Sequence, residues 1–439
     1  MNTRTRLMAG GQKTGTRWML CCLCLIVALA PTAPAEAAGF GIFEQGSKAM
    51  GMAGAFTAQA DDPSLMYHNL GGLAFVEERQ ISVGATWIHV DGTTFQGANP
   101  FPGADDRAEM VDLDVFPPHV YYLRPLNERW KLGVGVNSPF GLATEWQDKD
   151  NFSGRFLSNR AELTGVDLNL ALGYRVNESF GFGFGVVGRI SKVEQDRRIP
   201  FINPFTGGVT DIGQLALESD FDTGFGFNVG FLHRVGRAFS WGASYRSKVE
   251  VDYSGDGRLT QNLSGIPSFD AVIAGTLPFD QDLPIESNIE FPDQWSVGVA
   301  LLLTDNLLAE VDVNWTGWSS FDELPIDFVN DDLPDSTIEE EYEDVYNYRL
   351  GFQYTTASGS QWRVGFGIDE TPVPTASVSP LLPDNDRDVY TIGYGTSSGG
   401  MDIAFMWLDV PEVTTLDNRE GFFGTYDTDA YLVGVTFNF

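Results

Sequence analysis

Residues 180–192 read FGFGFGVVGRISK, in which large apolar residues alternate with glycine. Side chains alternate between the two faces of a β-strand, so Phe180, Phe182 and Phe184 share one face and small residues occupy the other. A strand of a soluble β-sandwich would expose a polar face to water. This stretch instead favours a transmembrane β-barrel, whose large residues meet lipid while its glycine and polar residues face the lumen.

The same period of two recurs elsewhere in the chain. In residues 130–137 the apolar residues alternate with Gly133, Gly135 and Asn137, and residues 241–253 alternate apolar with mainly polar residues. We expect the polar face of 241–253 to line the lumen and to carry these charged residues: Arg246, Lys248, Glu250 and Asp252.

Connection lengths indicate a barrel with an even number of strands. We expect fourteen strands, which begin near Gln80, His119, Trp130, Glu162, Phe180, Leu217, Ser240, Ile285, Leu307, Tyr342, Trp362, Asp388, Met401 and Tyr426. Short connections such as 176–179 alternate strictly with long, acidic ones such as 254–283. Outer-membrane barrels show this asymmetry between periplasmic turns and external loops, so the predicted fold class is all-β, a transmembrane antiparallel barrel.

The first 37 residues have the organisation of a secretory signal peptide. A basic region with Arg4 and Arg17 precedes the apolar stretch 19–30, and Ala35-Glu36-Ala37 forms the expected cleavage site. The apolar stretch is too short to span a bilayer. The mature chain would begin at Ala38.

Composition excludes several classes of function. Removal of residues 1–37 leaves a net charge of about −36, which disfavours nucleic acid as a partner. All three cysteines lie in the predicted signal peptide, and the four histidines are far apart without metal-site spacing. We therefore expect no metal and no cofactor. The G-x-G-x-x-G pattern at 183–188 falls inside a strand, so a dinucleotide site and an enzymatic role are not expected.

Residues 38–78 have neither a clean strand period nor a disordered composition. The lumen of a fourteen-stranded barrel is too wide for side chains alone to fill. We therefore predict that 38–78 is a luminal hatch and that 79–439 is the barrel; a periplasmic extension is the alternative. The candidate hatch residues are Asp61, Asp62, Asn69, Leu70 and Gly71.

A proline interrupts the third predicted strand. Pro139 cannot donate to the strand ladder, and Gly141 tolerates a bend or bulge. Such a strand is expected to separate from a neighbour and to leave an opening in the wall; the alternative is that the strand simply ends there. The candidate residues of this lateral opening are Asn137, Pro139, Phe140 and Gly141.

Several stretches together resemble the FadL family of outer-membrane transporters. They are Ala38-Gly39-Phe40, the Gly/Ala-rich run 46–55, DDPSLMYHN at 61–69 and NSPFGLATEW at 137–146. The resemblance implies passive uptake of long-chain fatty acids, or of hydrocarbons as in the relative TodX, with lateral exit at the kinked third strand. It also implies a monomer in the outer membrane of a Gram-negative bacterium. Where the family commonly has Asn-Pro-Ala, this chain has Asn69-Leu70-Gly71, so a fixed φ is replaced by flexible glycine.

The carboxylate of a fatty acid needs a cationic partner inside the lumen. Strand parity predicts that these cations face inward and could bind substrate: Arg189, Lys248, Arg246, Arg349 and Arg363. Arg189 and Lys248 are the first choices, and the resemblance places a basic residue of the binding pocket near Arg189. The alternative is that the cations pair with luminal acids such as Asp369, Glu250 and Asp252.

The external connection 254–283 is unusually apolar and could capture substrate. Its candidate residues are Leu259, Leu263, Ile266, Phe269 and Phe279. Packing of a compact loop on itself is the alternative. A general porin remains a further functional alternative, and the strongly negative charge mildly favours neutral hydrocarbons over anions.

The expected partners are the hydrophobic substrate, membrane lipid with lipopolysaccharide, and the barrel-assembly machinery, which reads a terminal aromatic such as Phe439.

Overall fold

The computed structural model describes residues 39–98, 101–102, 107–330 and 333–439. The predicted signal peptide and Ala38 lie outside these residues. Within the described ranges, no helix has the length and hydropathy of a membrane span.

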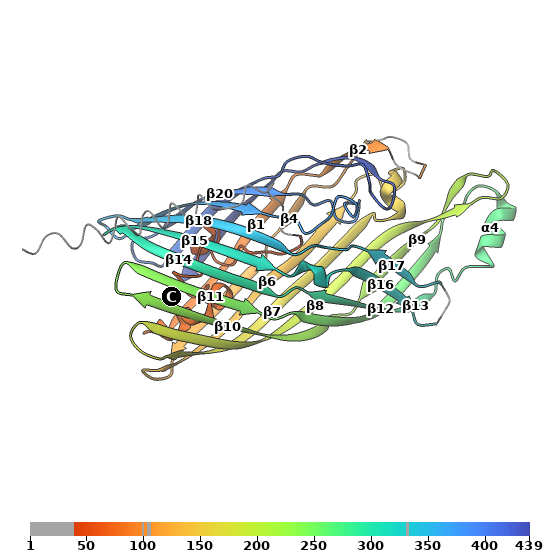
Figure 1. Cartoon of the computed structure of the whole chain (residues 1–439). Coiled ribbons are helices and arrows are strands. Elements are labelled where there is room, and N and C mark those ends of the chain that lie inside the picture. Colours follow the sequence, from red (N-terminus) through yellow and green to blue (C-terminus); the bar gives the residue numbers. More distant parts are fainter. Residues whose placement is uncertain (1–38, 99–100, 103–106, 331–332) are drawn as a thin grey trace, which may run out of the picture. The chain divides into compact units, whose positions relative to one another are not determined.

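Fourteen antiparallel strands close into a barrel (Figure 1), as the sequence predicts. Strand β24 pairs with β1 from Ser82↔Asn438 to Val90↔Ala430 and closes the ring. The wall strands are β1 (Gln80–Val90), β5 (Pro118–Pro125), β6 (Trp130–Glu145), β7 (Arg160–Arg175), β8 (Phe180–Ile202), β10 (Asp222–Val235), β11 (Phe239–Arg246), β14 (Gln294–Thr304), β15 (Leu307–Thr316), β18 (Val345–Thr355), β19 (Gln361–Asp369), β20 (Arg387–Gly395), β21 (Met401–Asp409) and β24 (Ala430–Asn438).

The long connections carry further elements. Strands β9 (Val209–Ser219), β12 (Val249–Gln261) and β13 (Asp282–Phe291) continue β10, β11 and β14, and with α4 (Pro267–Ala274) they project past the other strands (Figure 1). Strands β16 (Glu323–Phe328) and β17 (Ser336–Glu339) extend this side. A separate sheet contains β22 (Val413–Thr415), β23 (Phe423–Asp427), β2 (Thr94–Ala98) and β3 (Arg107–Glu109), while β4 (Leu113–Val115) pairs with β1. Short 3-10 turns are η2 (Ser153–Phe156) and η3 (Trp318–Ser320).

The alternation predicted around residue 184 is confirmed. Phe182 and Phe184 are 42% and 48% exposed on the outer face of β8. The glycines between them face inward, where a Cβ atom on Gly183 would lie 2.3 Å from the carbonyl oxygen of Leu70. Large residues therefore face outward, as in a wall that meets lipid, and glycine faces inward because only a bare backbone fits there.

The prediction that Lys248 faces the lumen is wrong. Strand β11 ends at Arg246 and β12 begins at Val249, and in the break between them the backbone N–H of Phe227 donates to the hydroxyl of Ser247 (2.9 Å). The break reverses the alternation, so Val251 is fully buried and Lys248 is exposed, paired with Glu290 at 2.7 Å.

The predicted luminal position of two acids, Glu250 and Asp252, is also wrong for the same reason. Glu250 and Asp252 follow the break and are exposed, and both accept hydrogen bonds from the side-chain amide of Asn288, at 3.3 and 2.6 Å. The predicted partner Asp369 is buried.

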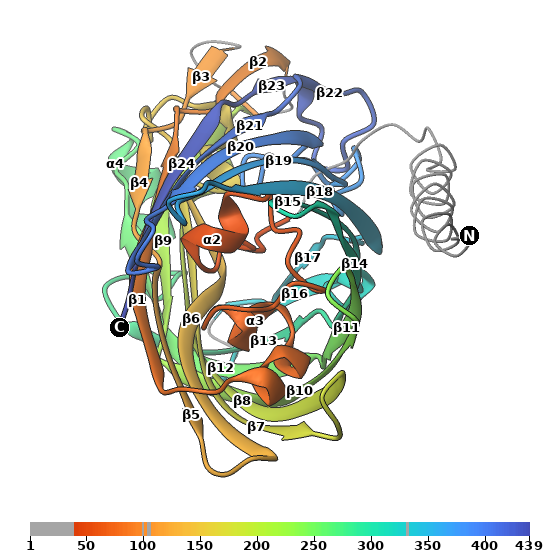
Figure 2. The same cartoon turned by 90° about the vertical axis from the view of Figure 1, so that its left-hand side faces the viewer.

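Residues 39–76 form a compact segment with three short helices, α2 (Ser47–Met50), α3 (Leu65–His68) and η1 (Leu70–Phe75). Figure 2 shows these helices within the ring of strands. Most of their side chains are buried, and the segment lies against inward-facing glycines of the wall; a Cβ on Gly365 would meet the backbone nitrogen of Ala53 at 2.4 Å. The bare inner face of the wall is thus matched to this segment.

Candidate functional site

Strand β6 is irregular at the predicted proline. Asn137 pairs with Asp167 of β7, but the next paired residue, Phe140, lies opposite Gly165, so β6 carries one extra residue at Pro139. On its other side, β6 pairs with β5 only as far as Val136. Beyond Val136 the edge of β6 therefore has no partner in β5. Strands β4 and β5 both pair with β1 instead of extending along β6.

The start of the described chain occupies this free edge. The N–H of Ile42 donates to the carbonyl of Pro139 (2.8 Å), and the N–H of Gly141 donates to the carbonyl of Phe40 (3.0 Å). A cavity of about 360 Å³ lies beside this pairing. It is lined by Val115, Pro117 and Pro118 on one side and by Ser138, Phe140 and Leu142 on the other.

Phe40 connects the free edge of β6 to an aromatic cluster. Its ring lies 4.6 Å from Trp318, 5.3 Å from Phe321 and 6.0 Å from Phe140, measured between ring centres. The backbone N–H of Gly39 donates to Asp384 Oδ2 in an external loop (3.0 Å). Residues 39–42 thus join the external loops to the irregular part of β6.

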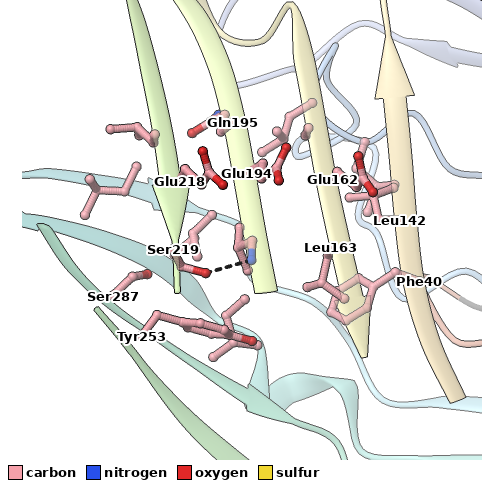
Figure 3. Close-up of a pocket in the computed structure, with 18 of the residues that line it drawn as sticks. Phe40, Leu142, Glu162, Leu163, Glu194, Gln195, Glu218, Ser219, Tyr253 and Ser287 are labelled. Carbon is pink, nitrogen blue, oxygen red and sulfur yellow. Dashed lines mark hydrogen bonds between the residues drawn. The ribbon is translucent and has the colours of Figure 1, made fainter. Parts of the chain in front are cut away.

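A second, mostly apolar cavity of about 80 Å³ also has Phe40 in its lining. Leu142, Leu163, Leu217, Ile285 and Ile289 contribute to its walls. Figure 3 shows Phe40, Leu163, Tyr253 and Gln195 around this space, where the hydroxyl of Ser219 accepts a hydrogen bond from the N–H of Val193 (2.9 Å). Phe40, Leu142 and Leu163 line both cavities, so only a few side chains separate the two spaces.

The predicted inward cations other than Lys248 are already engaged by the chain. Arg189 bonds both carboxylate oxygens of Asp167, at 2.7 and 2.8 Å. The remaining three pair as follows: Arg349 with Asp369, Arg363 with Asp402, and Arg246 with the carbonyl of Tyr67. For Arg189, Arg349 and Arg363 this arrangement favours the alternative in which the cations pair with luminal acids, whereas Arg246 bonds a backbone carbonyl of the inner segment.

Asn69 ties the inner segment to the wall. Its side-chain nitrogen donates to the carbonyl oxygens of Thr57 (2.7 Å) and Phe231 (2.9 Å), and its oxygen accepts from the N–H of Gly71 (2.8 Å). A Cβ on Gly71 would lie 2.3 Å from the carbonyl carbon of Phe231, and Leu70 is buried against β8. Glycine at 71 therefore permits close contact with β10, which differs from the flexibility that the sequence suggested.

Asp61 and Asp62 lie at the far end of this segment from Phe40. Asp61 pairs with Lys48 at 2.7 Å, and the Oδ1 atom of Asp62 accepts from the N–H and hydroxyl of Ser64. Burial raises the pKa of Asp62 to about 6. Both residues line a polar cavity that also contacts Phe439, next to the end of β24.

Sequence reasoning missed an acidic pair that holds the inner segment. Asp312 of β15 accepts the N–H groups of Phe56 and Thr57 through one oxygen, at 2.9 and 2.8 Å. Glu310 accepts those of Ala58 and Gln59, at 2.6 and 3.2 Å. Strand parity could have placed both acids on the inner face, because they alternate with Val311 and Val313.

The apolar external loop is packed on itself. Leu259 and Phe269 are buried, and Ile266 and Phe279 pack against the same clusters together with Ile212 and Ile273. Leu263 alone of the five candidates is strongly exposed, at 76%. The compact arrangement favours the alternative given for this loop.

A closed antiparallel barrel with large apolar residues outside and apolar cavities inside defines a β-barrel membrane protein of the outer membrane. The family described as outer membrane protein transport protein (OMPP1/FadL/TodX) matches residues 27–439, and the chain belongs to this family. It is therefore a transporter of hydrophobic molecules in the outer membrane of a Gram-negative bacterium, and it is not an enzyme. The family resemblance read from the sequence is confirmed.

Relatives match over most of their length. A long-chain fatty acid transport protein of Escherichia coli O6:H1 is 26% identical over 442 residues, covering 95% of this chain and 97% of the relative. Outer membrane protein P1 of Haemophilus influenzae is 25% identical over 395 residues, covering 82% of each.

Two solved structures share the fold. A FadL homologue of Pseudomonas aeruginosa superposes with a TM-score of 0.81 at 20% identity, covering 92% of this chain and 99% of that one. The toluene transporter TbuX of Ralstonia pickettii superposes with a TM-score of 0.65 at 17% identity, covering 91% and 100%.

Proposed function

We propose that this protein takes up long-chain fatty acids and releases them sideways into the outer membrane through the gap beside β6. The fatty-acid class is supported by relatives of that printed name, 26% identical over nearly the whole chain. The observation that carries lateral release is the free edge of β6 beyond Val136, next to a cavity whose lining is mainly apolar but includes Glu44, Glu162 and Arg387. An acyl chain that leaves this way avoids exposure to water, which would cost about 0.8 kcal/mol per methylene.

The inner segment acts as a hatch in this proposal. The carboxyl groups of Glu310 and Asp312 accept hydrogen bonds from four of its backbone N–H groups, and a buried N–H left without an acceptor costs about 1–3 kcal/mol. The pairing of residues 40–42 with β6 rests on two backbone bonds between neutral groups. Residues 39–42 are further held by the bond from Gly39 to Asp384 and by the packing of Phe40. We propose their displacement as the route of opening, because it leaves the four bonds to Glu310 and Asp312 intact, and the proposed hatch disfavours a general porin.

Uptake of uncharged hydrocarbons is the second candidate. It is favoured by the smaller cavity beside Phe40, of about 80 Å³. The described residues that line this cavity include several glutamates and no Lys or Arg. Long hydrocarbons would follow the same path, because the walls of both cavities are mainly apolar.

Uptake by intact cells tests the proposal. Cells that carry the protein are expected to take up labelled oleate saturably and faster than cells without it, and labelled hexadecane serves as the hydrocarbon arm. Oleate uptake no faster than in empty cells, with rapid uptake of hexadecane, would move the hydrocarbon candidate to first place. Cells with a variant lacking residues 39–76 test the hatch, since a general ion leak is expected only in that variant.

A further inference from the structure

The smaller, apolar cavity beside Phe40, of about 80 Å³, is lined by two buried polar side chains from the external connection between β17 and β18. Glu340 is 4% exposed and Tyr342 is 3% exposed, and both line the pocket. The hydroxyl of Tyr342 is buried without a hydrogen-bond partner among the described residues. The carboxyl of Glu340 likewise forms no hydrogen bond or ion pair with any residue of the described ranges; its backbone is held by Asp322 and Ser377.

Buried polar groups in folded proteins are nearly always hydrogen-bonded. Among the described residues, a buried phenol without a hydrogen-bond partner and an unpaired carboxyl, both lining one apolar pocket, therefore point to a ligand that supplies their partners. Tyr342 lies close to Phe321 and Trp318, with ring centres 5.0 and 5.9 Å apart, so its ring is fixed in the cluster that also holds Phe40. The polar end of a ligand would thus lie at the loop side of the pocket.

The charges around the pocket disfavour an anion. Glu162, Glu194 and Glu218 form a row across β7, β8 and β9 at the edge of the pocket (Figure 3), where they alternate with the buried Leu163, Gln195 and Leu217. Among the described residues, the cations paired with this row, Arg160 and Lys192, are engaged by these glutamates and do not offer a free charge to an anion. Arg160 pairs with Glu162 and Glu194, and Lys192 pairs with Glu194 and Glu218.

Within the described ranges, no cation forms an ion pair with Glu340. Arg419 is close enough to act on the charge of Glu340, but its ion pair is with Glu341, and Glu420 of the same loop adds a further negative charge. Arg197 lies two residues beyond Gln195 on β8 and is not among the residues that line the pocket. Deeper in the barrel, Arg189 is neutralised by Asp167.

We propose that this pocket binds the head group of its long-chain substrate in an uncharged, hydroxyl-bearing form, as a protonated carboxylic acid or an alcohol, with Glu340 and Tyr342 as hydrogen-bond partners. The inference rests on the proposed transport function and deepens it. A hydroxyl both donates and accepts, so it satisfies a phenol and a carboxyl together. A carboxylate has no proton to donate and adds a charge to an acidic, apolar pocket.

The electrostatics of the two residues agree with this assignment. Burial raises the pKa of Glu340 to about 8, with Arg419 opposing and Glu420 adding to the rise. Burial, with smaller effects of Glu340 and Asp384, raises the pKa of Tyr342 as well. Both side chains are therefore neutral near pH 7, and a neutral head group leaves the pocket without a net buried charge.

Equilibrium binding of a matched pair of ligands tests the proposal. The full chain in lipid nanodiscs is titrated with radiolabelled 1-dodecanol and dodecanoate at pH 7.5, and empty nanodiscs give the partition background. The alcohol is expected to bind at least tenfold more tightly. When the pH is lowered from 7.5 to 5.5, the apparent affinity for dodecanoate is expected to rise at least tenfold, because the protonated fraction of its carboxyl group increases as the pH falls toward the pKa. Affinity for dodecanol is expected to change less than twofold.

Variants locate the effect. Glu340→Ala and Tyr342→Phe are each expected to weaken dodecanol binding by about three- to tenfold, as the loss of one hydrogen bond predicts. Glu340→Lys is expected to reverse the preference in favour of dodecanoate. Glu339→Gln, one residue away and exposed, is the matched control and is expected to stay within twofold. The ratio between two ligands on one preparation does not depend on the folded fraction.

The outcomes distinguish a failure of the uncharged head group from a failure of the transport proposal. Dodecanoate that binds as tightly as dodecanol at pH 7.5, or a preference unchanged in Glu340→Lys, overturns the uncharged head group and leaves the transport proposal standing. Absence of specific binding for both ligands overturns both.

Discussion

Arg189 and Asp167 form a bidentate ion pair across β7 and β8, with Nε and Nη2 of the arginine at 2.7 and 2.8 Å from the two carboxylate oxygens. The guanidinium lies 4.4 Å from the ring centre of Phe140 and 4.6 Å from that of Phe291. The pair is thus buried directly beneath the irregular part of β6. Its charge is used within the wall, so the ion pair gives this inward arginine a role that does not require substrate.

Replacement of Arg189 by alanine is expected to destabilise the barrel by about 3–5 kcal/mol, because Asp167 would be left as a buried, unpaired charge. Urea unfolding in lipid vesicles, followed by tryptophan fluorescence, measures the change in the free energy of unfolding. The control is the double variant Arg189→Met with Asp167→Leu, which is expected to recover most of the loss and to retain oleate uptake. A stable double variant without uptake would instead make Arg189 the substrate partner.

Replacement of Gly71 by alanine is expected to destabilise the inner segment by about 1–3 kcal/mol, since the added Cβ would overlap the backbone of Phe231 and force a shift. Faster hydrogen exchange of the N–H groups of residues 56–72 measures the effect. Gly207→Ala is the matched control in an external turn, where a Cβ meets nothing within 4 Å although its positive φ adds some strain. Unchanged exchange in Gly71→Ala would show that the segment moves freely against β10.

The sequence predicted the barrel well because its signals are local. The alternation at 180–188 and the short turns each depend on a few neighbouring residues, and the structure retains them. The side on which Lys248 lies was predicted wrongly, because the break between β11 and β12 is not a local signal. It includes a hydrogen bond from the N–H of Phe227 to the hydroxyl of Ser247, twenty residues away in the sequence. Glu340 and Tyr342 were not found, since only the folding of a long external connection brings them to the pocket beside Phe40.

Removal of both anchoring acids, in the double variant Glu310→Ala with Asp312→Ala, is expected to loosen the inner segment that we propose to be a hatch. Four backbone N–H groups of residues 56–59 would lose their acceptors, and each buried donor left unpaired costs about 1–3 kcal/mol. Ion conductance in planar bilayers is expected to rise at least tenfold. Asp305→Ala, in the exposed turn between β14 and β15, is the control on the same hairpin. Conductance equal to that of the parent protein would contradict a hatch held by these acids.

A reversible cross-link at the free edge of β6 tests lateral release. Gly41 lies opposite Phe140 in an antiparallel bridge, flanked by the bonds from Ile42 to Pro139 and from Gly141 to Phe40, so the two residues form a non-hydrogen-bonded pair. Such pairs have Cα atoms about 4.5 Å apart, which suits a disulfide. The three native cysteines all lie within the predicted signal peptide, so no native thiol is expected to compete in the mature protein.

The double variant Gly41→Cys with Phe140→Cys is expected to take up oleate at least tenfold more slowly when oxidised, because residues 39–42 could no longer leave the edge of β6. A reductant is expected to restore the rate to that of the two single-cysteine variants, which also control for the loss of the Phe140 ring. Undiminished uptake by the fully cross-linked protein would mean that substrate leaves by another path, and lateral release at β6 would have to be abandoned.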